Sequence, residues 1–420
     1  MGPSADSDTL AAQSRKTGWR VNALLILFSL GVSLLLAEGL LRLVGHDHPQ
    51  WYRLDPLVGW RPRPGVTGWY SAAVDNYIAM NREGYRDVDH PVAKPPGTYR
   101  ILLLGDSMSE GVEVALQDLY WKRLESTLPQ CPAFSRLSVE VISFAVNGYG
   151  TAQEYLTLRQ RGLKYRPDLV LLAFFTGNDF TDNVEALGRH RDRPYFVLRD
   201  GGLVLDHTAG MAPDFASRQH LENLKQHLVD PIRIVQLFRQ AETKLRVLWR
   251  YGQADPRRID QPGLDSRVFV PPATPDWEQA WAVTEALIDA IAERARASGA
   301  GFAMTTLTNP LQVLPDDAAR DRFAKELGVP DLAYPDRRLA VFAASHGYAD
   351  AALAPALGAY AAEHHAALHG SDPHQPIGHW NALGHRLAAE ELRRSLCDFM
   401  ATGRLSPPQS QPQSGSNTFR

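Results

Sequence analysis

Four apolar runs of strand length constrain the fold of this 420-residue chain more than any other feature of its sequence. They span residues 99–104, 139–146, 168–175 and 301–307. The runs are nearly continuous rather than alternating, which is typical of strands buried on both faces of a parallel sheet. Helical patterns separate them, and the long one after Thr274 begins with Pro275, a residue favoured at a first helical turn. Strand and helix in alternation predict an α/β layered domain.

The N-terminal segment predicts a membrane anchor. Residues 1–20 are polar and carry three basic side chains near their end, and residues 21–37 follow without a charge. Extended to residue 44, a helix would cross ~30 Å of hydrocarbon, provided that Glu38 and Arg42 reach the interface. The basic flank predicts a cytoplasmic N-terminus and an exported remainder. The alternatives are a cleaved signal peptide, whose small-residue cleavage pattern is missing, and a buried helix.

The rest of the chain divides into a main domain and its additions. Residues 51–98, rich in Trp, Tyr, Arg and Pro, are expected to form an irregular or short-stranded lead-in beside a main domain over 99–402. Within that domain, residues 180–273 break the alternation with a predicted hairpin and a helical stretch, so they form a cap or a subdomain. Residues 403–420 form a tail whose Pro/Gln/Ser composition predicts disorder.

Polar residues follow three of the predicted strands. The first strand ends in Gly105-Asp106-Ser107, the second in Asn147-Gly148 and the third in Gly177-Asn178-Asp179. In a 2-1-3-4-5 strand order, the first and third strands flank the ligand-binding crevice, which places Ser107 opposite Asn178. A hydroxyl nucleophile with nearby N–H donors suits acyl transfer, so Ser107 N–H, Gly148 N–H and the Asn178 amide are candidate oxyanion donors. Each feature alone is more often a helix cap or a turn.

A candidate base lies near the C-terminus. His379 stands on the loop before the last predicted helix, where its imidazole can reach the edge of the sheet, whereas His385 falls at the helix start and is expected to be structural. No HExxH or comparable ligand spacing occurs. We therefore predict no metal site and no cofactor.

Together these residues resemble the SGNH (GDSL) hydrolase superfamily. Its four blocks are matched by Gly105-Asp106-Ser107, Gly148, Gly177-Asn178-Asp179 and His379, in the family's order. The resemblance implies a flavodoxin-like three-layer α/β/α fold with a parallel sheet in 2-1-3-4-5 order, and serine-dependent ester chemistry. The anchor, the lead-in and the ending around His379 further resemble exported bacterial members. A single-pass protein of the bacterial inner membrane, with a periplasmic or extracellular catalytic domain, is the expectation.

One position departs from the family pattern. The family usually places an Asp three residues before the catalytic His, and Pro376 stands there instead. The nearest carboxylate upstream is Asp372, seven residues before His379. Either the loop bulges and Asp372 orients the imidazole, or a backbone carbonyl does so and leaves a Ser–His dyad.

Three functions remain open from the sequence. The first is a membrane-anchored esterase that cleaves acyl esters, O-acetyl esters above all, on a glycan or a lipid. The second is an O-acyltransferase for an exported polysaccharide, and the third is a non-catalytic glycan-binding scaffold. The 44 basic residues nearly cancel the 47 acidic ones, which argues against nucleic acid as a partner. Cys131 and Cys397 would either pair in an oxidising compartment or remain two small apolar side chains.

Overall fold

The computed structural model describes residues 5–71, 74–188, 190–252, 264–370 and 377–405. Its centre is a five-stranded parallel sheet in the order β11-β10-β7-β5-β6. These strands are β5 (Thr98–Gly105), β6 (Ser138–Ser143), β7 (Leu169–Phe175), β10 (Gly301–Leu307) and β11 (Ala349–Ala352). Numbered along the chain, the order reads 2-1-3-4-5. The predicted α/β fold and strand order are therefore confirmed.

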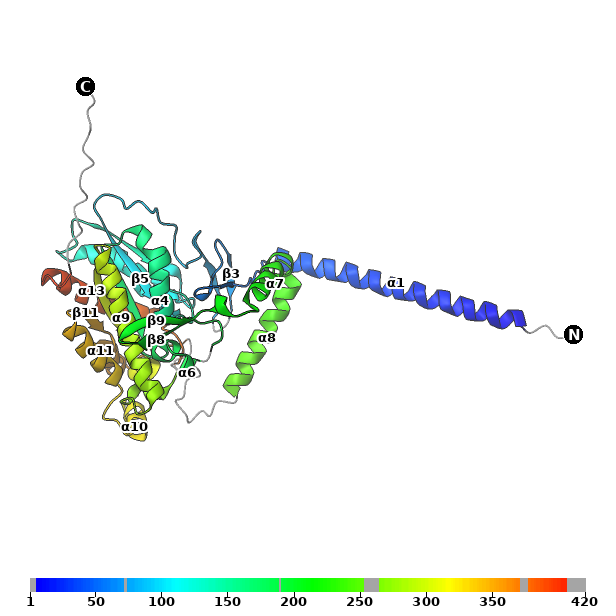
Figure 1. Ribbon diagram of the computed structural model, residues 1–420. Helices are drawn as coiled ribbons and strands as arrows, with labels where there is room; N and C mark the ends of the chain where they lie inside the picture. Colours follow the sequence, from blue (N-terminus) through cyan, green and yellow to red (C-terminus); the bar gives the residue numbers. More distant parts are fainter. Residues whose placement is uncertain (1–4, 72–73, 189, 253–263, 371–376, 406–420) are drawn as a thin grey trace, which may run out of the picture.

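Both faces of the sheet are buried, which explains why its strands read as continuous apolar runs. Every residue of β5 and β7 is buried. Along β5, Leu102 and Leu104 pack into one apolar core, and Ile101 and Leu103 pack into the other. The first core holds helices α4 (Thr151–Thr157) and α9 (Pro275–Ala297), and the second holds α3 (Tyr120–Thr127) and α13 (Ala382–Ala401). The layers are helices, sheet and helices (Figure 1).

Further helices of the main domain lie on these layers or in the connections between them. They are α2 (Ser107–Glu110), α5 (Asp179–Asp182), α6 (Glu185–Gly188), α10 (Asp317–Leu327), α11 (Tyr334–Ser345) and α12 (Ala354–His364). Separate 3₁₀ turns over residues 116–118 and 128–130 flank α3 on either side.

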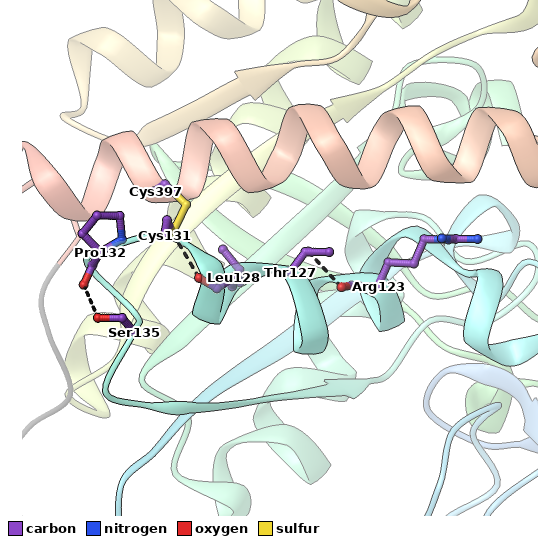
Figure 2. The surroundings of a disulfide bond; sticks show 7 residues. All are labelled: Arg123, Thr127, Leu128, Cys131, Pro132, Ser135 and Cys397. Carbon is purple, nitrogen blue, oxygen red and sulfur yellow. Dashed lines mark hydrogen bonds between the residues drawn. A yellow bond between two sulfur atoms is a disulfide. The ribbon is translucent and has the colours of Figure 1, made fainter.

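A disulfide joins the two ends of the main domain. Cys131 follows α3, and Cys397 lies on α13, which packs against α3 (Figure 2). The two residues are 266 positions apart in the sequence. Of the two alternatives left open by the sequence, the paired one is therefore correct.

The lead-in and the insertion lie beside the sheet. The lead-in forms two short antiparallel pairs, β1 (Tyr52–Asp55) with β2 (Gly59–Pro62) and β3 (Thr67–Tyr70) with β4 (Asn76–Ala79). The insertion holds the predicted hairpin, β8 (Tyr195–Arg199) with β9 (Gly202–His207), and then helices α7 (Phe215–Leu228) and α8 (Arg233–Gly252). The hairpin turns at Asp200 and Gly201, whose positive φ angles of 50° and 76° fit a two-residue turn.

The N-terminal helix α1 (Ala5–Leu43) projects away from the domain (Figure 1). Its stretch Trp19–Leu43 has a mean hydropathy of 2.3 and is long and apolar enough to cross a membrane. None of that stretch is buried against the other residues that the structure describes, which is unlike a core helix.

Candidate functional site

Ser107 lies just beyond the carboxyl end of β5, at the edge of the sheet where the parallel strands end. It is the first residue of α2, and the buried Asp106 caps that helix by accepting the Met108 N–H at 2.9 Å. A Cβ at Gly105 would lie 2.6 Å from Ser109 Oγ, so only glycine lets the strand turn into the helix this closely. The local sequence thus fixes a sharp strand-to-helix turn that leaves Ser107 half-buried among buried neighbours.

His379 meets Ser107 at this point. Its Nε2 lies 2.8 Å from Ser107 Oγ, although 272 positions separate the two residues in the sequence. The predicted nucleophile and base are therefore within hydrogen-bond reach of each other. When the ring is neutral with its proton on Nδ1, the Ser107 hydroxyl donates to Nε2, which is the geometry that a general base needs.

The loop that carries His379 is anchored on both sides. The Gly370 N–H donates to the His379 carbonyl at 2.9 Å, and Asn381 caps α13 through the Leu383 and Gly384 N–H groups. The buried His369 hydrogen-bonds through its ring to the Gly378 carbonyl at 2.8 Å. These contacts hold the His379 backbone between a fixed loop and a fixed helix start.

The other imidazole nitrogen contacts a residue that sequence reasoning missed. His379 Nδ1 lies 2.7 Å from Oε1 of Glu113, on the loop after α2. Asp372, the carboxylate considered from the sequence, lies outside the described residues. Nothing in the spacing marks Glu113, because it follows the nucleophile rather than preceding the base. Only its position six residues after Ser107, near the same sheet edge, offered a signal.

The electrostatics of this pair support an ionised carboxylate beside the imidazole. Burial lowers the pKa of His379, but the charge and hydrogen bond of Glu113 outweigh it and raise that pKa above its ordinary value of 6.5. Burial likewise raises the pKa of Glu113, yet His379 outweighs that effect and the pKa falls below the ordinary value. Glu113 therefore favours the imidazolium that forms when His379 takes a proton.

Gly148 follows β6 and carries a candidate oxyanion donor. Its φ of 72° lies in the left-handed region, where glycine is favoured, and a Cβ there would approach the Trp60 ring to 3.3 Å. The Trp60 indole N–H donates to the Asn147 carbonyl at 3.0 Å. That carbonyl belongs to the same peptide unit as the Gly148 N–H, which points the opposite way in a trans peptide. No described residue accepts this N–H.

Asn178 follows β7 and precedes α5. Its side-chain amide donates to Asp182 Oδ2 at 2.6 Å, which leaves a second amide N–H on the same nitrogen. Asp182 in turn pairs with Arg193 of the insertion at 3.2 Å, and Arg193 also donates to the Gly148 carbonyl at 2.8 Å. One guanidinium therefore connects the segments that carry two of the three candidate donors.

Three fully buried carboxyl groups belong to this part of the sheet edge. Burial raises the pKa of Asp106 to about 7, and burial together with mutual repulsion raises the pKa values of Glu154 and Asp179 well above the ordinary range. Among the described residues, no group of three or more His, Cys, Asp or Glu is arranged to hold a metal ion.

His385 lies apart from the reacting atoms, as expected. It is fully buried, and its Nδ1 accepts the Tyr120 N–H at 3.4 Å. Burial lowers its pKa to about 3, so the ring is neutral. It packs between α13 and α3 as a structural residue.

Comparisons with known proteins are limited to the fold. No family model and no curated protein matches the chain. It is similar to the solved structures of TesA (12% identity, TM-score 0.35), the acetyl xylan esterase AlAXEase (12%, 0.37) and the psychrotrophic esterase EstA from Pseudoalteromonas sp. (11%, 0.33). The matches cover 71%, 71% and 72% of this chain and 97%, 99% and 99% of the others. Two of them are described as esterases, and TM-scores of this size carry no argument for this chain.

Proposed function

We propose that this chain is a membrane-anchored serine ester hydrolase of the SGNH type. Ser107 is its nucleophile, His379 its general base and Glu113 the positioning residue for the imidazole. One observation carries the proposal: Ser107 Oγ, the His379 ring and the Glu113 carboxylate form one continuous hydrogen-bonded chain, with contacts of 2.8 and 2.7 Å. Such a chain of hydrogen bonds is the arrangement that activates a serine hydroxyl.

The reaction follows from the geometry. Ser107 Oγ attacks the acyl carbon while its proton passes to His379 Nε2, and the carbonyl electrons move onto the oxygen. The Ser107 and Gly148 N–H groups and the Asn178 amide are the proposed donors to that oxyanion. Collapse expels the alcohol, which takes the proton from His379, and leaves an acyl-enzyme. His379 then deprotonates a water molecule, whose oxygen attacks the acyl carbon; the ester bond to Ser107 breaks, the acid leaves, and His379 returns the proton to Ser107 Oγ.

The proposed substrates are acyl esters, with O-acetyl groups on a glycan or a lipid as the preferred class. An O-acyltransferase would share every step up to the acyl-enzyme and would use a sugar hydroxyl in place of water. The non-catalytic reading is disfavoured, because a scaffold without catalysis has no need for an aligned Ser107, His379 and Glu113.

The proposed anchor is the stretch Trp19–Leu43 of α1. No described part of the chain covers its exposed apolar surface, and a bilayer would bury that surface. The basic residues before it favour a cytoplasmic N-terminus and an active site on the periplasmic side of the bacterial inner membrane.

Labelling with a fluorophosphonate probe tests the nucleophile. The full chain in detergent is expected to label, and Ser107→Ala is expected to lose all labelling while it keeps the helical circular dichroism of the parent. Ser109→Ala is a matched control, since Ser109 lies on the same short helix and its Oγ hydrogen-bonds to Tyr120 instead of His379. A folded parent that does not label, or a Ser107→Ala variant that labels equally, would refute the proposal that this chain is a serine hydrolase.

A second assay separates hydrolysis from transfer. Release of the phenol from an aryl acetate is measured with and without added oligosaccharides, and acetylated sugars are sought by mass spectrometry. Free acetate in amounts equal to the phenol, whatever the acceptor, supports the hydrolase. Acetyl-oligosaccharide as the main product would replace it with the acyltransferase.

A further inference from the structure

Helix α8 of the insertion presents an apolar face that no part of the described chain covers. Phe238, Leu245 and Trp249 are 70%, 66% and 70% exposed. Their spacing of seven and four residues places them on one side of the helix. Side chains of this size on a helix otherwise pack into a core, so the face requires an explanation outside the domain.

The opposite side of α8 is the one that contacts the protein. Gln236 is buried and accepts the His48 N–H at 2.8 Å, and Gln240 contacts the His48 ring at 2.9 Å. One turn further along, Lys244 lies 3.8 Å from Asp75 of the lead-in. With its polar side fixed to the lead-in, α8 turns its apolar side outward.

The start of α8 is tied to the end of the proposed membrane span. The Glu38 carboxylate accepts the Arg233 and Ile234 N–H groups at 3.1 Å each, where the first turn of a helix leaves donors unpaired. Arg42 donates to the Pro231 carbonyl at 2.9 Å and pairs with Glu38 at 2.7 Å. Glu38 and Arg42 are the polar residues at the domain end of α1, so this joint lies at the level of the lipid headgroups if α1 spans the bilayer.

From this joint, α8 runs across the direction of α1 rather than along it (Figure 1). A helix that starts at headgroup level and runs across the span stays near the membrane surface. The sequence of α8 holds five basic residues and one acidic residue, but Arg233, Arg239 and Lys244 pair with Asp47, Asp230 and Asp75 outside the helix. The apolar face is therefore the feature that points to lipid, because large apolar side chains with an exposed Trp are typical of helices that lie in the membrane interface.

We infer that α8 is a second membrane contact, whose apolar face (Phe238, Leu245 and Trp249) inserts into the headgroup region of the bilayer that α1 spans. The inference rests on the proposed anchoring by α1. Two contacts, one a spanning helix and one lying flat, would fix the orientation of the domain over the membrane. The domain would then present its active site at a set height instead of swinging on a single helix.

The test places a nitroxide label at single introduced cysteines of the full chain, reconstituted in vesicles of phosphatidylcholine and phosphatidylglycerol. Collision rates with oxygen, which partitions into lipid, are compared with those of a water-soluble nickel chelate. Labels at Phe238→Cys and Leu245→Cys are expected to show a severalfold higher oxygen-to-nickel ratio than a label at Val341→Cys. Val341 is the matched control, because it is 71% exposed and lies on α11, away from the joint.

A further label at Leu30→Cys, within α1, separates the two proposals. If the Leu30 label reports lipid and the α8 labels resemble the Val341 label, the anchor stands and the α8 inference fails. If the Leu30 label itself reports water, the anchoring proposal fails. Shielding of the α8 labels from both reagents would indicate a protein partner instead of lipid, and would also overturn the inference. Circular dichroism of each labelled variant establishes that it is folded.

Discussion

The loops at the carboxyl ends of β5, β6 and β7, here called the rim, differ from the lead-in and insertion that surround them. The rim supplies the groups proposed to touch substrate, Ser107, Gly148 and Asn178. The surrounding segments supply groups that touch the rim instead, such as Trp60 on the Asn147 carbonyl and Arg193 on the Gly148 carbonyl. The rim therefore carries the groups proposed for the reaction, whereas the surrounding segments hold the backbone of the rim in place, and variants in each part should have effects of different size.

The largest effect, after loss of the nucleophile, is expected within the rim at Glu113. Glu113→Gln removes the charge that favours the imidazolium, and the turnover number should fall by up to about 10⁴-fold, as when the corresponding acid of a serine protease is neutralised. Steady-state hydrolysis of an aryl acetate measures it. Asp372→Asn is the matched control and should stay within a few-fold of the parent. A larger loss at Asp372 than at Glu113 would reverse the assignment.

The pH profile distinguishes positioning from mere structural support by Glu113. Because His379 acts as a base only when neutral, kcat/KM should rise as the pH passes its pKa, with a midpoint above 6.5 in the parent. Glu113 raises that pKa, so Glu113→Gln should move the midpoint to lower pH. An unchanged midpoint would leave Glu113 with a structural role only.

An intermediate effect is expected for a rim donor. Asn178→Ala should lower turnover by about 10²–10³-fold with little change in KM, because an oxyanion donor acts mainly in the transition state. Asp182→Asn keeps the Asn178 amide but removes the charge from the group that accepts its hydrogen bond, so turnover should fall by less than in Asn178→Ala. Equal losses in the two variants would mean that Asn178 serves the Asp182 contact and not the reaction.

The smallest effect is expected for the surrounding segments. Trp60→Phe keeps an aromatic ring at this position but removes the indole N–H that orients the peptide between Asn147 and Gly148. One hydrogen bond is worth about 1 kcal/mol, so turnover should fall about fivefold. Thermal unfolding of the variant checks that the fold is intact. A loss as large as that of Asn178→Ala would break the distinction between the rim and its surroundings.

The fold could be predicted from the sequence because burial constrains which residue types occur along a short stretch of chain. Strands covered on both sides are apolar along most of their length, and β5, β7 and β10 show this. The common location of the polar residues that follow each strand could be predicted as well, since the carboxyl ends of parallel strands share one edge of the sheet. The contact between Ser107 and His379 could be expected for the same reason, once the motif blocks suggested which histidine to choose.

Glu113 and Trp60 could not be found in this way. Each acts through a contact with a residue distant in sequence, and neither has a spacing that distinguishes it from an ordinary loop carboxylate or a packed aromatic ring. The departure at Pro376 directed attention to Asp372 on the loop of the base, whereas the carboxylate on the imidazole comes from the loop of the nucleophile.

The sequence by itself determined the sheet, the order of the polar strand ends and the apolar N-terminal helix, because these depend on hydrophobic pattern and on residue type along short stretches. The tertiary structure alone decided which carboxylate holds His379, that Cys131 pairs with Cys397, and that α8 starts on Glu38 with its apolar side outward. These are contacts between distant segments. They depend on how the packed layers bring the segments together, which no local sequence pattern encodes.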